Sequence, residues 1–218
     1  MQYKFDLDKG SELIIKRLND RSYKAYAVGG FVRDSLLKVK TSDIDITTDA
    51  RPQEVMDIFA DYKLVDIGIK YGTVAIIIDA CSYEVTTFRS DGLYSDGRRP
   101  DEVTFSKDLR EDLSRRDFTV NAMAYNPDEG LIDFFGGQDD LRKGQIKTVG
   151  DPNKRFEEDY LRMLRAIRFA CKLDMDLDGA LVEAIKIRAE NIVKVSFERI
   201  GQEFSKILIT DKPVKGIN

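Results

Sequence analysis

The chain has 218 residues, of which 42% are hydrophobic and 34% charged, so a folded protein with a sizeable core is expected rather than a disordered one. The absence of histidine excludes Ser-His-Asp and Cys-His catalysis as well as histidine-ligated zinc. Residues 1–137 hold 19 Lys and Arg against 25 Asp and Glu, whereas residues 138–218 hold 16 against 14. An acidic first part argues against broad nucleic-acid binding there and suits carboxylates whose charge a divalent cation offsets.

Hydrophobic periodicity predicts helices and strands in the first part of the chain and helices alone in the last. Helices are expected at residues 9–20, 31–37, 51–60 and 116–125, and strands at 23–28, 43–46, 74–78, 83–88 and 131–134. Residues 90–112 are polar and rich in turn-forming residues, which is typical of a long mobile loop. From about Asp151 the pattern is helical throughout. The fold class is therefore α+β, a head followed by a helical extension.

Neither a signal peptide nor a membrane span is expected, because the N-terminus is polar and no segment approaches the ~20 apolar residues that cross a bilayer. Cys81 and Cys171 lie far apart in the sequence. They are expected to be reduced thiols of a cytoplasmic protein.

A glycine pair and two aspartates lie close together in the sequence. Gly29 and Gly30 follow a predicted strand and precede a predicted helix, where they allow phosphate to approach backbone N–H groups. Asp43 and Asp45 point to one face of a predicted strand, where magnesium can offset their repulsion and serve in-line displacement. Each feature alone is more often a structural turn or a solvated strand face, but the combination is much more specific.

A third carboxylate is expected from a neighbouring strand. Glu84 alternates with the apolar Val85, whereas the competing Asp79 is placed at a strand end or turn. Glu84 is therefore preferred, either as a metal ligand or as a general base toward a 3′-hydroxyl. Further on, Arg115 and Arg116 precede Asp117, so they are candidates for contacting triphosphate or ribose; capping of a helix by Asp117 is the alternative.

Asp159 and Arg162 are three residues apart and are expected to share one face of a helix. The plain interpretation is a surface ion pair of little energetic worth. A carboxylate beside a guanidinium also presents an acceptor next to a donor, which matches cytosine and adenine but neither uracil nor guanine. Because mismatched desolvated groups reject a wrong substrate strongly, the pair is a candidate for selecting C and A without a template.

These segments resemble, in order, the five motifs of the bacterial-type (class II) tRNA nucleotidyltransferases, or CCA-adding enzymes, and of the related bacterial poly(A) polymerases. Residues 90–112, with Arg98-Arg99-Pro100, resemble the family's flexible loop. The matching segments are residues 29–34 with Asp43-x-Asp45, Arg115-Arg116-Asp117, Phe134-x-Gly136-Gly137 with Leu141, Glu158-Asp159-x-x-Arg162, and residues 195–200 (VSFERI), which support the neck in the family.

The resemblance implies a polymerase-β-like nucleotidyltransferase head with a mixed sheet (residues 1–137) and an all-helical neck (138–218). In the family a body and a tail follow the neck. It further implies a template-independent, two-metal addition of C, C and A to the 3′ end of tRNA from CTP and ATP, with Mg²⁺. The residues carried over are the catalytic Asp43, Asp45 and Glu84, of which the two aspartates are metal ligands, and the nucleotide-binding Gly29, Gly30, Arg33, Arg116, Asp117, Asp159, Arg162 and Arg165.

Other functions fit part of the sequence. Within the class these are a poly(A) polymerase or an enzyme that adds only CC or only A; the loop favours full CCA addition, because CC-restricted enzymes tend to lack its motif. From other classes, a nucleotide- or RNA-binding protein without catalysis is disfavoured by the complete set of acids. A small-molecule nucleotidyltransferase would not need the pair Asp159 and Arg162.

Overall fold

The structure, a computed structural model, describes residues 3–41, 43–92 and 103–217. Their contacts divide the chain into two compact units. The first takes in the chain up to residue 91 with residues 103–115 and 121–134, and the second takes in residues 116–120 and the chain from 135 onward. The first unit contains the large sheet and the second is mainly helical.

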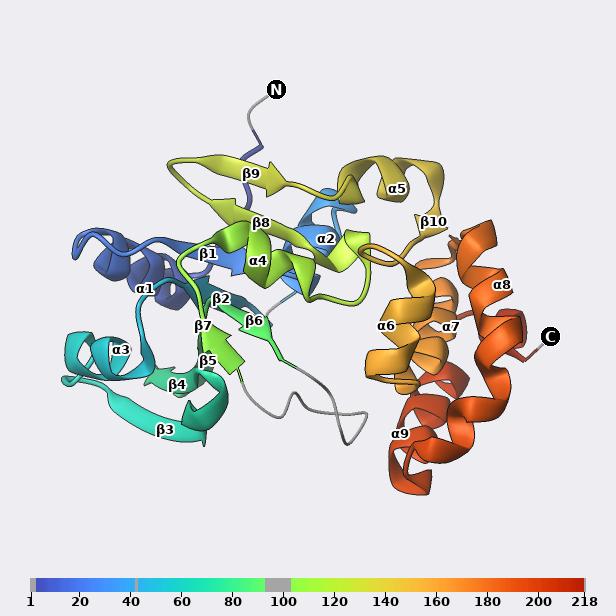
Figure 1. Cartoon of the computed structure of the whole chain (residues 1–218). Coiled ribbons are helices and arrows are strands. Elements are labelled where there is room, and N and C mark those ends of the chain that lie inside the picture. Colours follow the sequence, from blue (N-terminus) through green and yellow to red (C-terminus); the bar gives the residue numbers. More distant parts are fainter. Residues whose placement is uncertain (1–2, 42, 93–102, 218) are drawn as a thin grey trace. The chain divides into compact units, whose positions relative to one another are not determined.

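The first unit is built on a mixed sheet, which in the described residues has seven strands in the order β3-β4-β5-β2-β1-β8-β9 (Figure 1). β2 and β5 run parallel, and the other neighbouring strands run antiparallel. The strands are β1 (Ala25–Val28), β2 (Asp45–Thr48), β3 (Lys63–Gly68), β4 (Thr73–Ile78), β5 (Cys81–Thr87), β8 (Met123–Asn126) and β9 (Gly130–Asp133).

Burial alternates along β5 and at the start of β2. Ile46 and Val85 are partners in the register and each is 1% exposed, whereas the preceding residues, Asp45 and Glu84, are exposed. Because successive side chains of a strand point to opposite faces, the apolar face of β2 and β5 is turned to the core and the acidic side chains lie on the other face.

Helices cover the core of the first unit. α1 packs on β1, β2 and β5, and α3 packs on β4 and β5 (Figure 1). Asp8 caps α1 by accepting a hydrogen bond from the backbone N–H of Ser11 at 2.8 Å. Gly10 lies so close to the ring of Tyr83 that a Cβ atom there would clash. The helices are α1 (Lys9–Asn19), α2 (Gly30–Leu36), α3 (Pro52–Ile58), the 3₁₀ turn η1 (Ile69–Tyr71) and α4 (Leu109–Ser114).

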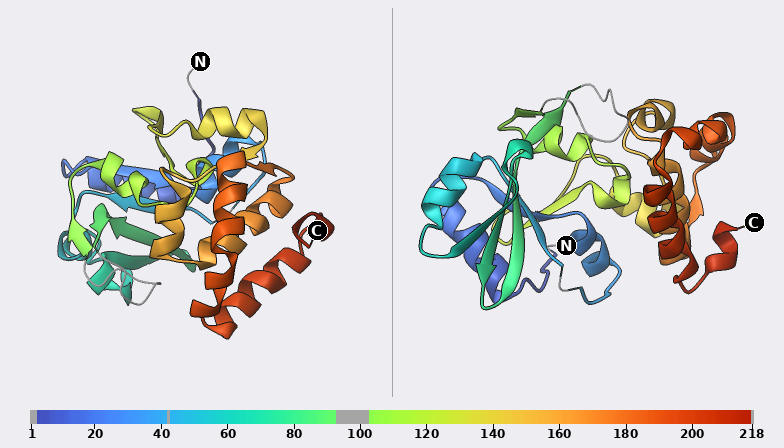
Figure 2. Two further views of the ribbon diagram at one scale, coloured as in Figure 1. Left: turned by 45° about the vertical axis from the view of Figure 1, so that its right-hand side comes forward. Right: turned by 90° about the horizontal axis from the view of Figure 1, so that it is seen from below.

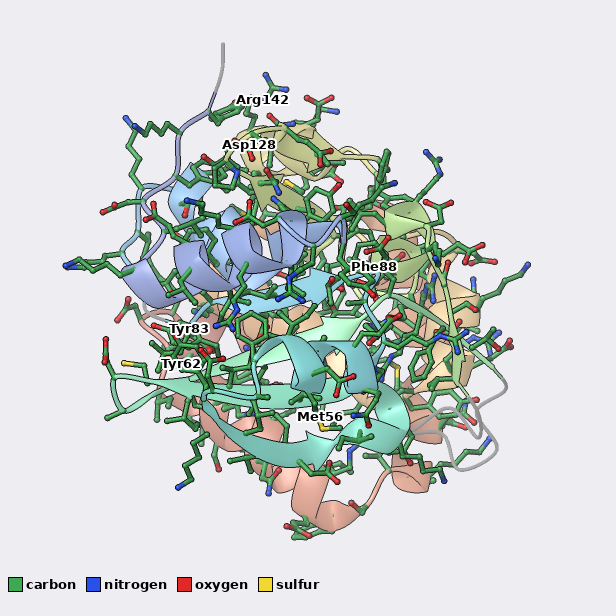
Figure 3. All side chains as sticks on the ribbon, turned by 90° about the vertical axis from the view of Figure 1, so that its left-hand side faces the viewer. Met56, Tyr62, Tyr83, Phe88, Asp128 and Arg142 are labelled. Atoms are coloured by element: carbon green, nitrogen blue, oxygen red, sulfur yellow. The ribbon has the colours of Figure 1, made fainter. Side chains whose placement is uncertain are left out.

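A buried carboxylate links three elements of this unit. Asp112 on α4 is 0% exposed, and its oxygens accept hydrogen bonds from Oγ1 of Thr47 at 3.2 Å and from Nη2 of Arg115 at 2.9 Å. The backbone N–H of Arg89 lies 3.4 Å from the same carboxylate. Asp112 thus joins α4 to β2 and to the hairpin of β6 (Arg89–Asp91) and β7 (Val103–Phe105). Phe88, which is labelled in Figure 3, is fully buried. Its ring lies 6.2 Å from that of Tyr26.

The second unit is a group of helices around an aromatic core. Phe118 and Phe156 are 0% exposed, and the ring of Phe118 packs edge-on against Phe169 at 5.6 Å. α7 and α9 lie side by side (Figure 2). The elements are α5 (Gly137–Lys143), β10 (Gln145–Ile146), α6 (Pro152–Glu158), α7 (Leu161–Leu173), β11 (Asp176–Leu177), α8 (Gly179–Arg188), η3 (Ala189–Lys194), α9 (Phe197–Leu208) and η4 (Pro213–Gly216). Among the described residues, no helix has the length and apolar character needed to cross a membrane.

Most predicted elements are present, with four differences. The part of the chain predicted to be all-helical also contains the short parallel pair of β10 and β11. The helix predicted for residues 116–125 is wrong: this segment forms the 3₁₀ turn η2 (Thr119–Asn121) and then β8, because its apolar residues complete the sheet beside β1. β3 was not predicted, because most of its side chains are exposed and give no apolar alternation. Residues 90–112 form no continuous loop, since β6, β7 and α4 lie within them; residues 93–102, with Arg98-Arg99-Pro100, lie outside the described residues.

We predict that Asp112→Ala lowers the free energy of unfolding of the first unit by about 3–5 kcal/mol, because it leaves the guanidinium of Arg115 without its buried partner. Asp61→Ala serves as the control. Asp61 pairs with Arg17 at 2.8 Å at the surface, where an ion pair adds little, so the unfolding midpoint should stay unchanged. Urea unfolding of both variants checks this. Equal midpoints would show that Asp112 does not hold these elements together.

Candidate functional site

Three strands bring the glycine pair and an acidic side chain to one end of the sheet. Asp45 begins β2 and pairs with Val28, the last residue of β1. Gly29 follows with a φ of 69°, a left-handed conformation that favours glycine, and its N–H donates to the carbonyl of Met123 at 3.2 Å. α2 then begins at Gly30. The turn therefore places the first N–H groups of α2 at the sheet end where Asp45 lies.

The two aspartates are separated by a buried isoleucine. Asp43 and Asp45 are exposed, while Ile44 is 5% exposed. β2 begins at Asp45, so Asp43 precedes the strand instead of lying in it as predicted. The alternation of exposed acid, buried isoleucine and exposed acid is nevertheless present.

Glu84 lies beside this pair on the adjacent strand. The register of β2 with β5 pairs Ile46 with Val85, which sets Asp45 alongside Glu84. Glu84 is exposed, but the protein atoms around its carboxylate remove part of its hydration. This desolvation raises the pKa of Glu84 above its usual value, and the negative charges of Asp45 and Asp43 raise it further. The competing Asp79 lies in the turn between β4 and β5, with a φ of 48°. The three acids thus act on one another electrostatically.

The donor chemistry of these acids fits a hard divalent cation, since carboxylate oxygens are its usual protein ligands. No group of three or more His, Cys, Asp or Glu side chains within residues 3–41, 43–92 and 103–217 is arranged to hold a metal ion. A pair of carboxylates completed by substrate phosphates is the arrangement that magnesium commonly uses.

Arg33, predicted to face a triphosphate, points into the first unit. It is 3% exposed; its Nε donates to Asp34 at 2.8 Å and its Nη1 donates to the side-chain oxygen of Asn121 at 2.5 Å. Its guanidinium therefore joins α2 to the segment before β8.

The segment Arg115-Arg116-Asp117 is divided between the units: Arg115 belongs to the first, and Arg116 and Asp117 belong to the second. Arg116 is half-buried, and Asp117 is 9% exposed. Asp117 accepts a hydrogen bond from the N–H of Phe118 at 2.9 Å and, with its other oxygen, from Nε of Arg165 at 2.9 Å. The charge of Asp117 raises the pKa of Arg165. Asp117 caps no helix, because the predicted helix is absent; it pairs with Arg165 instead.

The predicted helix bearing both Asp159 and Arg162 is interrupted. α6 ends at Glu158, Asp159 is extended, and α7 begins at Leu161, so the two side chains do not share a helix face. The carboxylate of Asp159 accepts from the N–H of Leu161 at 3.0 Å and from Arg199 at 2.7 Å. Arg162 donates to the carbonyl of Arg155 at 3.0 Å and pairs with Glu158. Asp159 and Arg162 are each 8% exposed.

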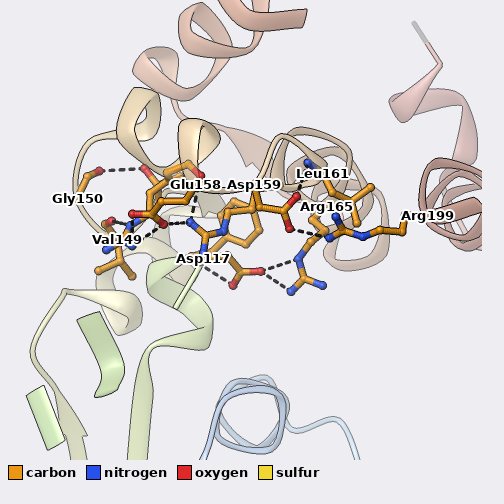
Figure 4. A network of polar contacts seen from close by, with 12 residues as sticks. Asp117, Val149, Gly150, Glu158, Asp159, Leu161, Arg165 and Arg199 are labelled. Carbon is orange, nitrogen blue, oxygen red and sulfur yellow. Dashed lines mark hydrogen bonds and ion pairs between the residues drawn. The ribbon is translucent and has the colours of Figure 1, made fainter. Parts of the chain in front are cut away.

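Figure 4 shows the carboxylates of Asp117 and Asp159 turned toward different guanidinium groups, those of Arg165 and Arg199. Sequence reasoning placed Arg199 in the last motif but did not connect it to Asp159. The available signal was weak: an arginine near the start of a predicted helix, forty residues downstream of the acid. Glu158, the partner of Arg162, also lies in a motif that the sequence analysis identified, but no role was predicted for it.

Comparison with protein families gives two matches. Residues 25–147, more than half of the chain, match the model described as the poly(A) polymerase head domain. Residues 174–218 match the model described as a probable RNA and SrmB-binding site of polymerase A.

Curated relatives and solved structures give the same family. A CCA-adding enzyme of Limosilactobacillus reuteri is 48% identical over 94% of this chain and 50% of its own length, and one of Enterococcus faecalis is 46% identical over 90% and 48%. The Bacillus stearothermophilus CCA-adding enzyme in complex with CTP superposes with a TM-score of 0.86 at 42% identity, over 94% of this chain and 49% of that one. The Thermotoga maritima CCA-adding enzyme complexed with tRNA superposes with a TM-score of 0.81 at 31% identity, over 97% and 50%.

The chain spans about half the length of the curated relatives it matches. Its mixed sheet followed by helices agrees with these structures, so the fold is the polymerase-β-like α+β head with a helical neck. With the head-domain model covering more than half of its residues, the chain belongs to the poly(A) polymerase head domain family.

Proposed function

We propose that this chain is the nucleotidyltransferase part of a CCA-adding enzyme, which adds C, C and A to the 3′ end of tRNA from CTP and ATP without a nucleic-acid template. The observation that carries the proposal is the meeting of the glycine turn, Asp45 and Glu84 at one end of the sheet. The relatives named CCA-adding enzymes, matched over most of this chain, supply the reaction. With tRNA as the acceptor, the cytoplasm is the proposed place of action.

The proposed domains are a head of residues 1–137 and a neck of residues 138–218. The helices from α6 to α9 support the neck, since all of them belong to the second compact unit. Arg116 and Asp117 also belong to that unit by their contacts, although they precede the proposed boundary.

Magnesium is the proposed cofactor, with Asp43 and Asp45 as its protein ligands. When bound, it supplies positive charge that stabilises the charge developing on the transferred phosphoryl group. Glu84 lies close enough to both aspartates for their charges to raise its pKa, which favours proton uptake by its carboxylate. In our proposal, Glu84 accepts the proton of the primer 3′-hydroxyl as the hydroxyl oxygen attacks the α-phosphorus.

The nucleotide is positioned by backbone and arginine groups. Gly29 and Gly30 lack side chains that would keep phosphate away from the N–H groups of α2. Arg33 holds this helix through Asn121, and we retain it as a triphosphate-binding residue. Arg116 and Asp117 are proposed to contact the ribose, and Arg165 to position Asp117 while adding positive charge near the nucleotide.

Base selection is assigned to Asp159 and Arg162. The carboxylate accepts a hydrogen bond from the amino group of cytosine or adenine, and the guanidinium donates to the adjacent ring nitrogen. Both side chains are largely buried, so a base that mismatches them leaves desolvated groups unsatisfied. Uracil and guanine would present an oxygen to the carboxylate and an N–H to the guanidinium.

A poly(A) polymerase is the second candidate, because both matching family models are described by that activity. We predict that the chain, given Mg²⁺ and labelled CTP or ATP, incorporates C, C and A in order on tRNA primers that end before CCA, after C or after CC. Primer-extension gels check this. Repeated A addition on any primer would contradict CCA addition and favour the second candidate.

Asp43→Ala and Asp45→Ala should each lower incorporation by at least about 100-fold, the loss expected when a group that stabilises transition-state charge is removed. Both side chains are exposed, so the melting temperature should stay near that of the unaltered chain. Asp57→Ala, an exposed acid on α3, is the matched control and should keep full activity. Near-normal activity of either aspartate variant would refute the metal assignment.

Glu84 offers a test that needs no turnover. Since the negative charge of Asp45 helps to raise its pKa, Asp45→Asn should lower the pKa of Glu84, and Mg²⁺ should lower it in the unaltered chain. Asp79→Asn, in the β4–β5 turn, should leave it unchanged. Carbon-13 NMR titration of the carboxyl groups measures all three. No response to either Asp45→Asn or Mg²⁺ would separate Glu84 from the proposed metal site.

A further inference from the structure

The carboxylate of Asp159 is held from both sides. The helix break after Glu158 leaves Asp159 extended, so one oxygen reaches forward to the N–H of Leu161 at the start of α7, at 3.0 Å. The other oxygen receives Nη2 of Arg199 from α9 at 2.7 Å. A charge-assisted bond of this length is stronger than a neutral one and fixes the torsion of the carboxylate.

Neighbouring arginines are committed to other acids. Arg165, which feels the charge of Asp159, donates to Asp117 (Figure 4). Arg162 pairs with Glu158. A carboxylate free to rotate between such guanidinium groups would turn toward them and lose the orientation needed to accept a hydrogen bond from a base.

We propose that Arg199 is a positioning residue for base selection: it fixes the Asp159 carboxylate so that this acid presents an acceptor to the amino group of cytosine or adenine. The inference rests on the proposed function, since it assumes that Asp159 contacts the base. It assigns to α9 a part in nucleotide choice through an arginine that need not touch the nucleotide.

The chain contains a matched control for this role. Arg168 on α7 donates through Nε to Glu203 on α9 at 2.6 Å, so this pair also links α9 to the α7 region. The side chains of Arg168 and Glu203 are 14% and 5% exposed, against 18% and 11% for Arg199 and Asp159. Loss of either arginine removes a buried pair of similar kind, but only Arg199 contacts the proposed base-selecting acid.

The experiment compares the equilibrium binding of CTP and UTP, with Mg²⁺, to the unaltered chain, R199M and R168M by calorimetry. The unaltered chain should prefer CTP, and R168M should keep that ratio even if its melting temperature falls. R199M should lower the ratio by about tenfold, the effect of one hydrogen bond to a charged group, and the change should lie in CTP binding. R199K, which keeps the charge but not the planar fork, should give an intermediate ratio.

A double-variant cycle with D159A separates positioning from general support of the neck. If Arg199 acts through Asp159, adding R199M to D159A should not change the ratio further. If the unaltered chain prefers CTP and R199M has the same ratio of CTP to UTP binding, the inference is overturned but the proposed function is not. No preference in the unaltered chain would overturn base selection in the proposed function and this inference with it. Should R199M fail to fold, R199K decides: an unchanged ratio overturns the inference, and a lowered one supports it.

Discussion

The parallel pairing of β2 with β5 is the constraint on which the acidic site depends. It aligns Ile46 with Val85 in the core and thereby sets Asp45 alongside Glu84 on the opposite face. Because side chains alternate along a strand, a slip of one residue would bury Glu84 and expose Val85. The apolar core thus enforces the register, and the register brings together acids that repel one another. Burial of aliphatic side chains thereby offsets the electrostatic cost of assembling the site.

In the second unit, buried acidic side chains are paired with arginines. Asp117, Asp159 and Glu203 are each less than 10% exposed, and each receives a hydrogen bond from an arginine of another part of the unit. An ionised carboxylate without a partner would be too costly at such depth, whereas a paired one is tolerated and fixes local geometry. The pairing therefore offsets part of the cost of burying these charges, and it restricts the orientation of each carboxylate. Fixed orientation is the property that template-independent choice of a base requires.

Sequence reasoning predicted the elements whose periodicity is strong, including α1, β4, β5 and the helices from residue 151 onward, because burial of one face leaves a regular apolar pattern. It wrongly predicted a helix for residues 116–125, because a short apolar run fits both the helical and the strand periodicity. Pairing with β1 makes part of this segment the strand β8. At the candidate site sequence reasoning expected Glu84 on a strand next to that of Asp45, and the register of β2 with β5 sets the two residues alongside each other. It could not find the pairing of Asp159 with Arg199, which depends on how a helix break and a distant helix meet in space.

Acidic side chains of the two units differ in whether a basic side chain pairs with them. This difference separates acids that are neutralised within the fold from acids suited to bind a ligand. Among the described residues, no lysine or arginine is paired with Glu84, and the pKa of this group is raised by desolvation and then by the negative charges of Asp45 and Asp43. Glu203 has two basic partners, Arg168 and Lys206, and its pKa is lowered despite burial. Folding has thus compensated Glu203 with the protein's own cations, whereas Glu84 faces charges of its own sign, those of Asp45 and Asp43. A divalent cation at this place would offset these charges and suit the carboxylate oxygens as ligands, and substrate phosphates could complete its coordination.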